Sequence, residues 1–221
     1  IMLEECRLPY AVHPVDLRAG DRLRSAFLAI SAAGRVPAIV DSDGPGGKPI
    51  RLSEPGAILV YLAAKTGRLM PRSERGRYEM LQWLMWHDAG AEVGGGPARP
   101  HAVSHGRPPA ALETDGASPH PCEVLDIRLG RTGAYVAGAH YGIADIAIWP
   151  WVRSQASRGM DLAGHPNLER WFESVGARPA VQRGIALLAD RLEPPAGGEA
   201  RENPSGTARP AQRRGGTRLQ A

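Results

Sequence analysis

The residues best suited to bind a small charged molecule are Ser53, Glu54 and Pro55, where an apolar segment turns into a helical pattern that runs to Gly67. The first N–H groups of a helix lack partners and lie at the positive end of its dipole, so a helix start favours a carboxylate. Pro55 has no N–H to offer. The residues also fit a plain helix start, because proline is favoured in the first turn and Ser53 can cap it.

Other residue types predict little chemistry. The seven histidines form no H-E-x-x-H pair or other tight spacing, so no metal site is expected. Cys6 and Cys122 lie far apart and belong to no C-x-x-C motif, so both are expected to be reduced thiols. Trp149, Trp151 and Trp171 fit a hydrophobic core or its edge rather than a ligand site.

The charge of the chain lies mostly at one end. The net charge is +4, and residues 194–221 hold five arginines and two glutamates, a net of +3, which leaves +1 for residues 1–193. Because this positive charge lies in a terminal tail and not on the rest of the chain, no basic groove and no nucleic-acid partner are expected. No apolar run reaches the roughly 18 residues that span a bilayer, and nothing at the N-terminus reads as a signal peptide. We therefore expect a cytoplasmic protein with no membrane partner.

The first ninety residues alternate between two hydrophobic periods, and the expected elements begin in the order helix, strand, helix, strand, strand, helix. Residues 36–41 and 49–52 flank the turn sequence DSDGPGGKP, which predicts a β-hairpin. The expected elements are a helix ending before Pro9, a strand over 11–17, a helix over 21–30, the two strands of the hairpin, and a helix over 56–65.

Only helical patterns follow Pro71. RGRYEMLQWLMWHDAG places Tyr78, Leu81, Leu84 and Met85 on one face, and HYGIADIAIWPWVRS, HPNLERWFESV and PAVQRGIALLADRL are three further helical segments. The sequence therefore predicts an α/β domain over 1–67 and an all-α domain over 73–192.

Two segments do not fit this pattern. Residues 94–121 contain six prolines and five glycines with little apolar periodicity, which indicates disorder or an eroded or frameshifted segment. Residues 194–221 have the composition of a disordered basic tail.

Five segments together resemble a known family: VPAIVD, SEPGAILVYLA, GRYEMLQWLMW, GIADIAIWPW and HPNLERWFESVGARPAVQR. In this order they resemble the glutathione transferases, and most of all the bacterial nu-class members that act as glutathione-dependent disulfide reductases. The resemblance covers roughly residues 1–86 and 123–192. It implies a thioredoxin-like N-terminal domain, an all-helical C-terminal domain, glutathione as co-substrate and a homodimer.

The resemblance implies which residues would bind glutathione. Val36 and Pro37 match the family's cis-proline pair, in which the first residue offers its backbone to glutathione as an antiparallel strand partner; without the resemblance, Pro37 would be expected to be trans. Glu54 stands where the family binds the α-ammonium. Pro55 replaces a serine whose hydroxyl and N–H bind the α-carboxylate, so two donors are absent.

Two arginines also fall at family positions. Arg35 matches a basic residue that can face the glycyl carboxylate, although a solvated arginine is an equal alternative. Arg22 stands where the family tends to have a glutamine that reaches glutathione.

Asp145 by itself could be mistaken for a catalytic acid, but its neighbours in the sequence indicate a different role. The family has Ser or Thr three residues earlier, which forms a capping box with this aspartate. Gly142 keeps the cap position and loses the side-chain half of the box. We therefore expect Asp145 to be structural.

Proteins of this type begin with a strand and a loop that carries the catalytic residue, whereas this chain opens inside the following helix at IMLEECRLPY. The resemblance therefore predicts an activating residue upstream of Ile1, no catalytic residue in this chain, and a sheet whose neighbouring strands lack a ladder partner.

The sequence thus predicts a glutathione transferase-like protein, acting on a small electrophile or a disulfide, with weak or no activity as given. The alternatives are a non-enzymatic binding or dimerisation protein of the same fold and an inactive gene remnant.

Overall fold

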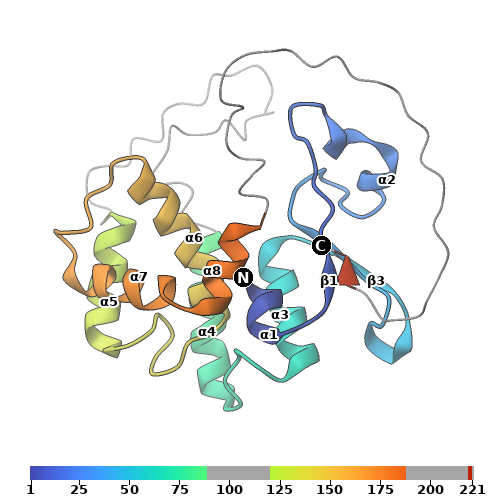
Figure 1. Cartoon of the computed structure of the whole chain (residues 1–221). Coiled ribbons are helices and arrows are strands. Elements are labelled where there is room, and N and C mark those ends of the chain that lie inside the picture. Colours follow the sequence, from blue (N-terminus) through green and yellow to red (C-terminus); the bar gives the residue numbers. More distant parts are fainter. Residues whose placement is uncertain (89–119, 188–218, 221) are drawn as a thin grey trace, which may run out of the picture. The chain divides into compact units, whose positions relative to one another are not determined.

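The computed structural model describes residues 1–88, 120–187 and 219–220 (Figure 1). The chain divides into two units, one with Ile1 and residues 3–53 and 179–221, the other with Met2 and residues 54–178. The helix over 55–66, which the sequence assigned to the first domain, falls in the second unit because it packs against the helix over 143–157. The predicted boundary at 67–73 stays a prediction.

The first unit combines short helices with a small sheet. Its elements are α1 (Met2–Cys6), β1 (Tyr10–Ala11), the 3-10 turn η1 (Asp21–Leu23), α2 (Ser25–Leu28), β2 (Ala38–Asp41), the 3-10 turn η2 (Pro45–Gly47), β3 (Ile50–Ser53), α8 (Pro179–Ala186) and β4 (Leu219–Gln220).

The sheet has the strand order β1-β4-β2-β3. The predicted hairpin is confirmed: β2 and β3 are antiparallel, with Ala38 opposite Ser53 and Asp41 opposite Ile50. Strand β4 is parallel to β1 and antiparallel to β2. The prediction that neighbouring strands lack a ladder partner is therefore wrong for β1 and β2, because β4 lies between them.

Strand β4 comes from the predicted disordered tail. Leu219 and Gln220 form the strand, and the rest of residues 194–221 lies outside the described residues.

Two other predicted elements differ from the structure. The strand expected over 11–17 ends at Ala11; beyond it Pro14 has no N–H, and the Asp16 carboxylate accepts hydrogen bonds from the N–H groups of Arg18 and Ala19 in a turn. The helix expected over 21–30 is broken at Arg24, whose φ of −68° and ψ of 142° are extended.

The second unit is helical. It contains α3 (Pro55–Thr66), α4 (Glu74–Trp86), α5 (Pro121–Thr132), α6 (Ile143–Ser157) and α7 (Pro166–Gly176). Helix α6 packs against α3, α4 and α7, and α5 packs against α7. Helix α5 was not predicted from the sequence, and its first residue, Pro121, belongs to the irregular segment 94–121. Residues 94–119 of that segment lie outside the described residues.

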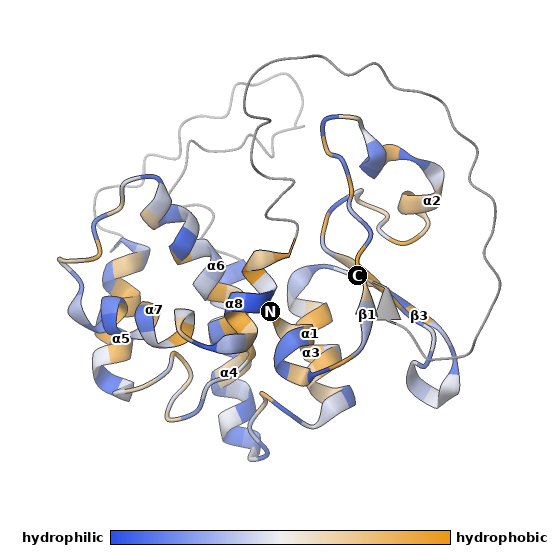
Figure 2. Ribbon diagram, in the orientation of Figure 1, coloured by the Kyte–Doolittle hydropathy of each residue, from blue (hydrophilic) through white to orange (hydrophobic). Residues whose placement is uncertain are grey.

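Local sequence explains where α3 and α7 begin and where α3 ends. Proline occupies the first position of each helix, and α3 stops at Gly67, whose φ of 65° is left-handed. Helix α3 is apolar along most of its length (Figure 2) and buries Ile58, Leu59, Leu62 and Ala63. Helix α7 buries Leu168, Trp171 and Val175, which share one face.

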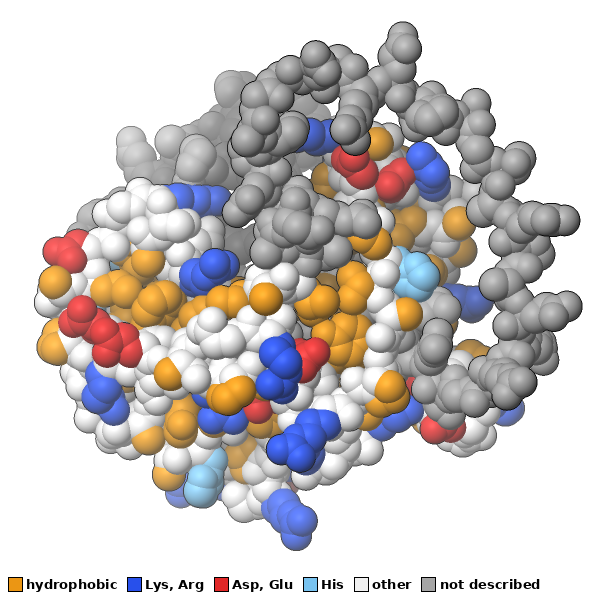
Figure 3. Space-filling model, viewed as in Figure 1, with side chains coloured by type: hydrophobic (Ala, Val, Ile, Leu, Met, Phe, Trp, Pro, Cys, Tyr) orange, Lys and Arg blue, Asp and Glu red, His pale blue; other side chains and the backbone are white. Residues whose placement is uncertain are grey.

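Charged and apolar side chains mix on the surface. On the face drawn in Figure 3, the described Lys and Arg side chains are scattered among apolar and acidic ones. Among the described residues, no helix is both long and apolar enough to cross a membrane.

Candidate functional site

The start of α3 gives the clearest candidate site. Ser53 is the last residue of β3, Glu54 is the N-cap and Pro55 the first helical residue. The C=O of Glu54 accepts the N–H of Ile58 at 3.1 Å, while the Glu54 side chain is exposed and caps no helical N–H. The expectation that Ser53 caps this helix is wrong, because the turn begins one residue later.

Glu54 has an unusual backbone. Its φ of 72° and ψ of 117° lie outside the regions that a residue with a Cβ adopts easily. Such conformations cost about 1–3 kcal/mol and gather at functional sites, where the surrounding structure holds them. Sequence reasoning could not find this feature, because nothing in RLSEPG marks the glutamate as left-handed.

A carboxylate of the chain already lies against the first turn of α3. Gly56 is buried, and a Cβ placed on it would lie 2.5 Å from Oδ2 of Asp88, which follows α4. The Asp88 carboxylate is therefore close to the positive end of the helix, where an anion is favoured. Asp88 was not predicted from the sequence, because only the closeness of Gly56 to residue 88, 32 positions later, reveals it.

In the first unit, Val36 and Pro37 directly precede β2. The Val36–Pro37 peptide bond is cis, as the resemblance implied. Val36 is 46% exposed and lies outside the β2–β3 ladder, which begins at Ala38. Val36 therefore lies just before β2, and its role as a strand partner for a ligand stays a prediction.

The two candidate arginines lie on neighbouring stretches of backbone. Gly34 has a φ of 61°, and a Cβ on it would lie 2.9 Å from the carbonyl oxygen of Arg22. The N–H of Arg35 donates to Oγ of the buried Ser31 at 3.0 Å. Both arginine side chains are exposed, and their roles toward glutathione stay predictions.

Asp145 has a structural place. It is fully buried, and its carboxylate accepts hydrogen bonds from the N–H of Val136 at 3.0 Å, the N–H of Gly142 at 2.9 Å and the indole of Trp171 at 2.8 Å. Three donors occupy its oxygens inside the core, so it has no exposed face for acid–base chemistry. This arrangement agrees with the capping role expected for Asp145.

Cys122 does not supply an activated thiol. Both cysteines are buried, and burial raises the pKa of the Cys122 thiol to about 11. Its Sγ also donates to Sδ of Met160 at 2.9 Å. Cys122 is therefore protonated near neutral pH and a poor nucleophile. Among the described residues, no three His, Cys, Asp or Glu side chains gather as a metal site.

Comparison with known proteins identifies the family. Residues 1–65 match the model of the glutathione S-transferase N-terminal domain, and residues 88–179 match that of the C-terminal domain. The chain belongs to the glutathione S-transferase family. Its fold is therefore a thioredoxin-like domain followed by a helical one, as the sequence predicted.

Individual relatives agree with this family. The chain is 41% identical over 200 residues to the disulfide-bond oxidoreductase YfcG of Escherichia coli, covering 87% of this chain and 89% of that protein. It is 33% identical to the disulfide-bond oxidoreductase YghU of the same organism, covering 83% and 68%. The predicted resemblance to disulfide reductases of this family is confirmed.

A solved structure shows the same fold. A glutathione transferase family member from Pseudomonas fluorescens, solved with two glutathione molecules bound, matches with 36% identity and a TM-score of 0.69. The match covers 83% of this chain and 85% of that one.

Proposed function

We propose that this protein binds glutathione weakly and belongs functionally with the glutathione-dependent transferases and disulfide reductases of its family. The observation that carries the proposal is Glu54, an exposed carboxylate held at a strained φ of 72° at the start of α3. Strain of this kind persists where it serves a function. Binding the α-ammonium of glutathione is a function that an exposed carboxylate can perform.

Two features support weak rather than strong binding. Pro55 offers neither an N–H nor a hydroxyl to the α-carboxylate of glutathione. Each missing charge-assisted hydrogen bond removes about 1.5–3 kcal/mol. Asp88 adds a negative charge at the same helix end, where it opposes a second carboxylate. Val36, Arg35 and Arg22 would bind the rest of the tripeptide through backbone pairing and charge.

In the reaction of this family, the glutathione thiolate attacks an electrophile or one sulfur of a disulfide. With a disulfide, a new S–S bond forms, the old one breaks and the second sulfur leaves as a thiolate. The protein would position glutathione and stabilise its thiolate. No residue of this chain is assigned as the catalytic one. A homodimer and a cytoplasmic location are part of the same proposal.

Substitutions at Pro55 test the proposal. Pro55→Ala restores the N–H, and Pro55→Ser restores both the N–H and the hydroxyl, so the two variants form a graded series. We expect glutathione affinity, measured by isothermal titration calorimetry, to rise about tenfold with alanine and up to about a thousandfold with serine. Equal affinities in all three proteins would show that the α-carboxylate does not bind at this helix.

A non-enzymatic protein of the same fold is the second candidate, favoured by Pro55 and Asp88 together. Retention on immobilised glutathione with elution by free glutathione supports the first candidate. An intact dimer that is not retained, even with Pro55→Ser, supports the second.

A further inference from the structure

The second unit holds a cavity between two of its helices. Helices α4 and α5, both labelled in Figure 1, pack on different neighbours, α4 against α6 and α5 against α7. A cavity of about 320 Å³ lies between α4 and α5, and its surface is mainly apolar. Its lining residues are Gln82 and Trp83 of α4, and Val124, Ile127, Arg128 and Arg131 of α5. None of them belongs to the candidate site at the start of α3.

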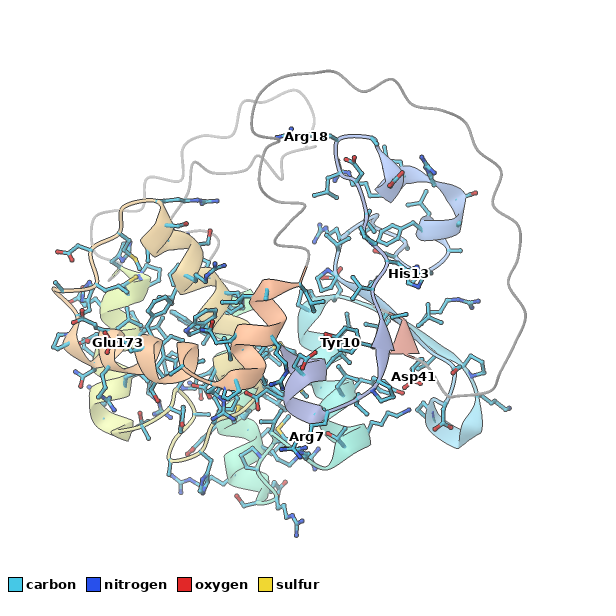
Figure 4. The ribbon with its side chains drawn as sticks, in the orientation of Figure 1. Arg7, Tyr10, His13, Arg18, Asp41 and Glu173 are labelled. Atoms are coloured by element: carbon cyan, nitrogen blue, oxygen red, sulfur yellow. The ribbon has the colours of Figure 1, made fainter. Side chains whose placement is uncertain are left out.

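Helix α5 has two opposite faces. One face contacts α7, the helix on which Glu173 is labelled in Figure 4: the Asp126 carboxylate accepts the N–H of Asn167 at 2.8 Å. A Cβ on Gly130, one turn later, would lie 3.0 Å from Nδ2 of the same Asn167. The cavity residues of α5 start two positions before Asp126, about 200° around the helix, and follow the spacing i, i+3, i+4, i+7. They therefore form the face that points away from α7.

The cavity wall combines a positioned aromatic ring with free hydrogen-bond donors. The ring of Trp83 packs edge-on against Trp86 at 5.3 Å between centroids, and Cζ of Arg128 lies 5.3 Å from its centroid. Nε of Arg128 donates to the C=O of Val136 at 2.8 Å, which fixes this guanidinium and leaves its two Nη groups available. Within the part of the chain that the structure describes, neither the indole N–H of Trp83 nor the guanidinium of Arg131 has a hydrogen-bond partner.

The charge of the cavity wall is positive. Arg128 and Arg131 carry a charge at neutral pH, and none of the lining residues is acidic. Two carboxylates of the same helices are engaged elsewhere, Asp126 with α7 and Glu79 with Arg75, whose Nε lies 3.3 Å from its Oε1. An apolar cavity with an aromatic ring and unpaired guanidinium groups favours a planar apolar molecule that carries a negative charge. Its volume is at the lower end of ligand sites, which suits one or two rings.

We propose that the cavity between α4 and α5 binds a small aromatic carboxylate, with its ring against Trp83 and Ile127 and its carboxylate on Arg131. Arg128 adds a second positive charge beside the ring of Trp83. The site is separate from the glutathione site proposed at the start of α3, so the aromatic acid is a second ligand and does not replace glutathione.

Nuclear magnetic resonance on the full-length chain tests this proposal, because each of the five tryptophans gives one indole N–H signal. Naphthoate is the probe, and naphthylmethanol and naphthylmethylammonium are its neutral and cationic counterparts. We expect naphthoate to shift the Trp83 signal until it saturates, while the signal of Trp171, whose indole donates to the buried Asp145, does not move. The variant Trp83→Phe, which keeps an aromatic ring and lacks the indole, identifies the Trp83 signal.

The charge of the probe separates this site from a general apolar surface. Naphthylmethanol should bind at least about fivefold more weakly than naphthoate, because it cannot form a charge-assisted hydrogen bond with a guanidinium. Naphthylmethylammonium should bind more weakly still, since two cations line the cavity. A Trp83 signal that naphthoate does not shift would overturn the proposal, and so would equal affinities for the three compounds.

Arg131→Gln tests the carboxylate contact without disturbing the core, because Arg131 is exposed in the last turn of α5. It should weaken naphthoate binding about fivefold, measured by calorimetric titration. Arg75→Gln removes the same charge from an exposed arginine of α4 that does not line the cavity, so it is the matched control and should leave the affinity unchanged. Equal affinities in the two variants would overturn the proposal. None of these measurements uses glutathione, so their failure is distinct from failure of the proposed function.

Discussion

Met80 fills the space that a side chain at position 142 would need. A Cβ on Gly142 would lie 3.0 Å from Sδ of Met80 and 2.8 Å from the carbonyl oxygen of Leu69, and it would also meet Cε of Met80. The same sulfur accepts the N–H of Ala144 at 3.3 Å, in the first turn of α6. A thioether from α4 therefore takes the place of the missing capping hydroxyl.

This relationship predicts coupling between positions 80 and 142. Gly142→Ser alone should lower the free energy of unfolding by about 1–3 kcal/mol, because the pocket is full. Met80→Ala alone should lower it by about 2–5 kcal/mol. The double variant should be more stable than the two single effects predict by at least about 0.5 kcal/mol, since the serine gains room and can cap α6. Urea unfolding measures all four proteins, and additive values would contradict the coupling.

Replacing Glu54 should separate stability from binding. Glu54→Gly relieves the positive φ and should raise the free energy of unfolding by about 1 kcal/mol. Glu54→Gln keeps a Cβ in the same conformation, so its stability should stay near that of the wild type. Both variants should bind glutathione less tightly, because both lose the carboxylate. Urea unfolding measures the stabilities, and calorimetric titration measures the affinities for glutathione. A Glu54→Gly variant less stable than the wild type would show that the backbone of Glu54 is not strained.

Neutralising Asp88 should favour a bound carboxylate. Asp88→Asn removes the negative charge beside Gly56, so glutathione affinity should rise severalfold while stability falls by about 0.3–1 kcal/mol from the lost helix–charge interaction. Glu123→Gln removes an acidic charge from the first turn of α5 and is the matched control. Calorimetric titration should show tighter binding only for Asp88→Asn; the same gain in both variants would indicate a general charge effect.

The ion pair between α1 and α8 should give stability that acid removes. Nε of Arg183 lies 2.6 Å from Oε2 of Glu4, and the phenol of Tyr10 donates to Oε1 at 2.7 Å. The hydrogen bond from Arg183, then that from Tyr10, lowers the pKa of Glu4. A carboxyl with a lowered folded-state pKa stabilises the fold above its ordinary value of 4.5 and loses this effect as the pH falls through the folded value.

Glu4→Gln should therefore cost roughly 0.5–1 kcal/mol at pH 7, a modest value because the Arg183 side chain is 55% exposed. The difference from wild type should shrink steadily below pH 4.5. Urea unfolding across pH 3–7 follows it, and a constant difference over that range would rule out the ion pair as its source.

The sequence predicted the elements that form through interactions between residues close together in the chain. The hairpin of β2 and β3 was predicted from its Gly- and Pro-rich turn, and α3 from its apolar spacing and the stop at Gly67. The positive φ of Glu54 was not predictable, because glutamate rarely adopts this conformation and only the surrounding structure holds it there. The contact between Gly56 and Asp88 was missed for a related reason, since it joins two elements.

Strand β4 is the clearest example of an element that could not be predicted from the sequence. Two residues in a tail of disorder-like composition carry no strand pattern, and their partners lie at positions 10–11 and 40–41. A pattern in a short stretch of sequence cannot show a pairing between residues so far apart.

The backbone of Glu54 has a consequence for natural variation. At a φ of 72° the mutation that stabilises the fold most readily is Glu54→Gly, so a lineage selected only to stay folded would drift to glycine at this position. A lineage selected to bind an ammonium group would retain the acid despite its strain. The residue found at this one position in related genomes therefore records which selective pressure has acted on each copy.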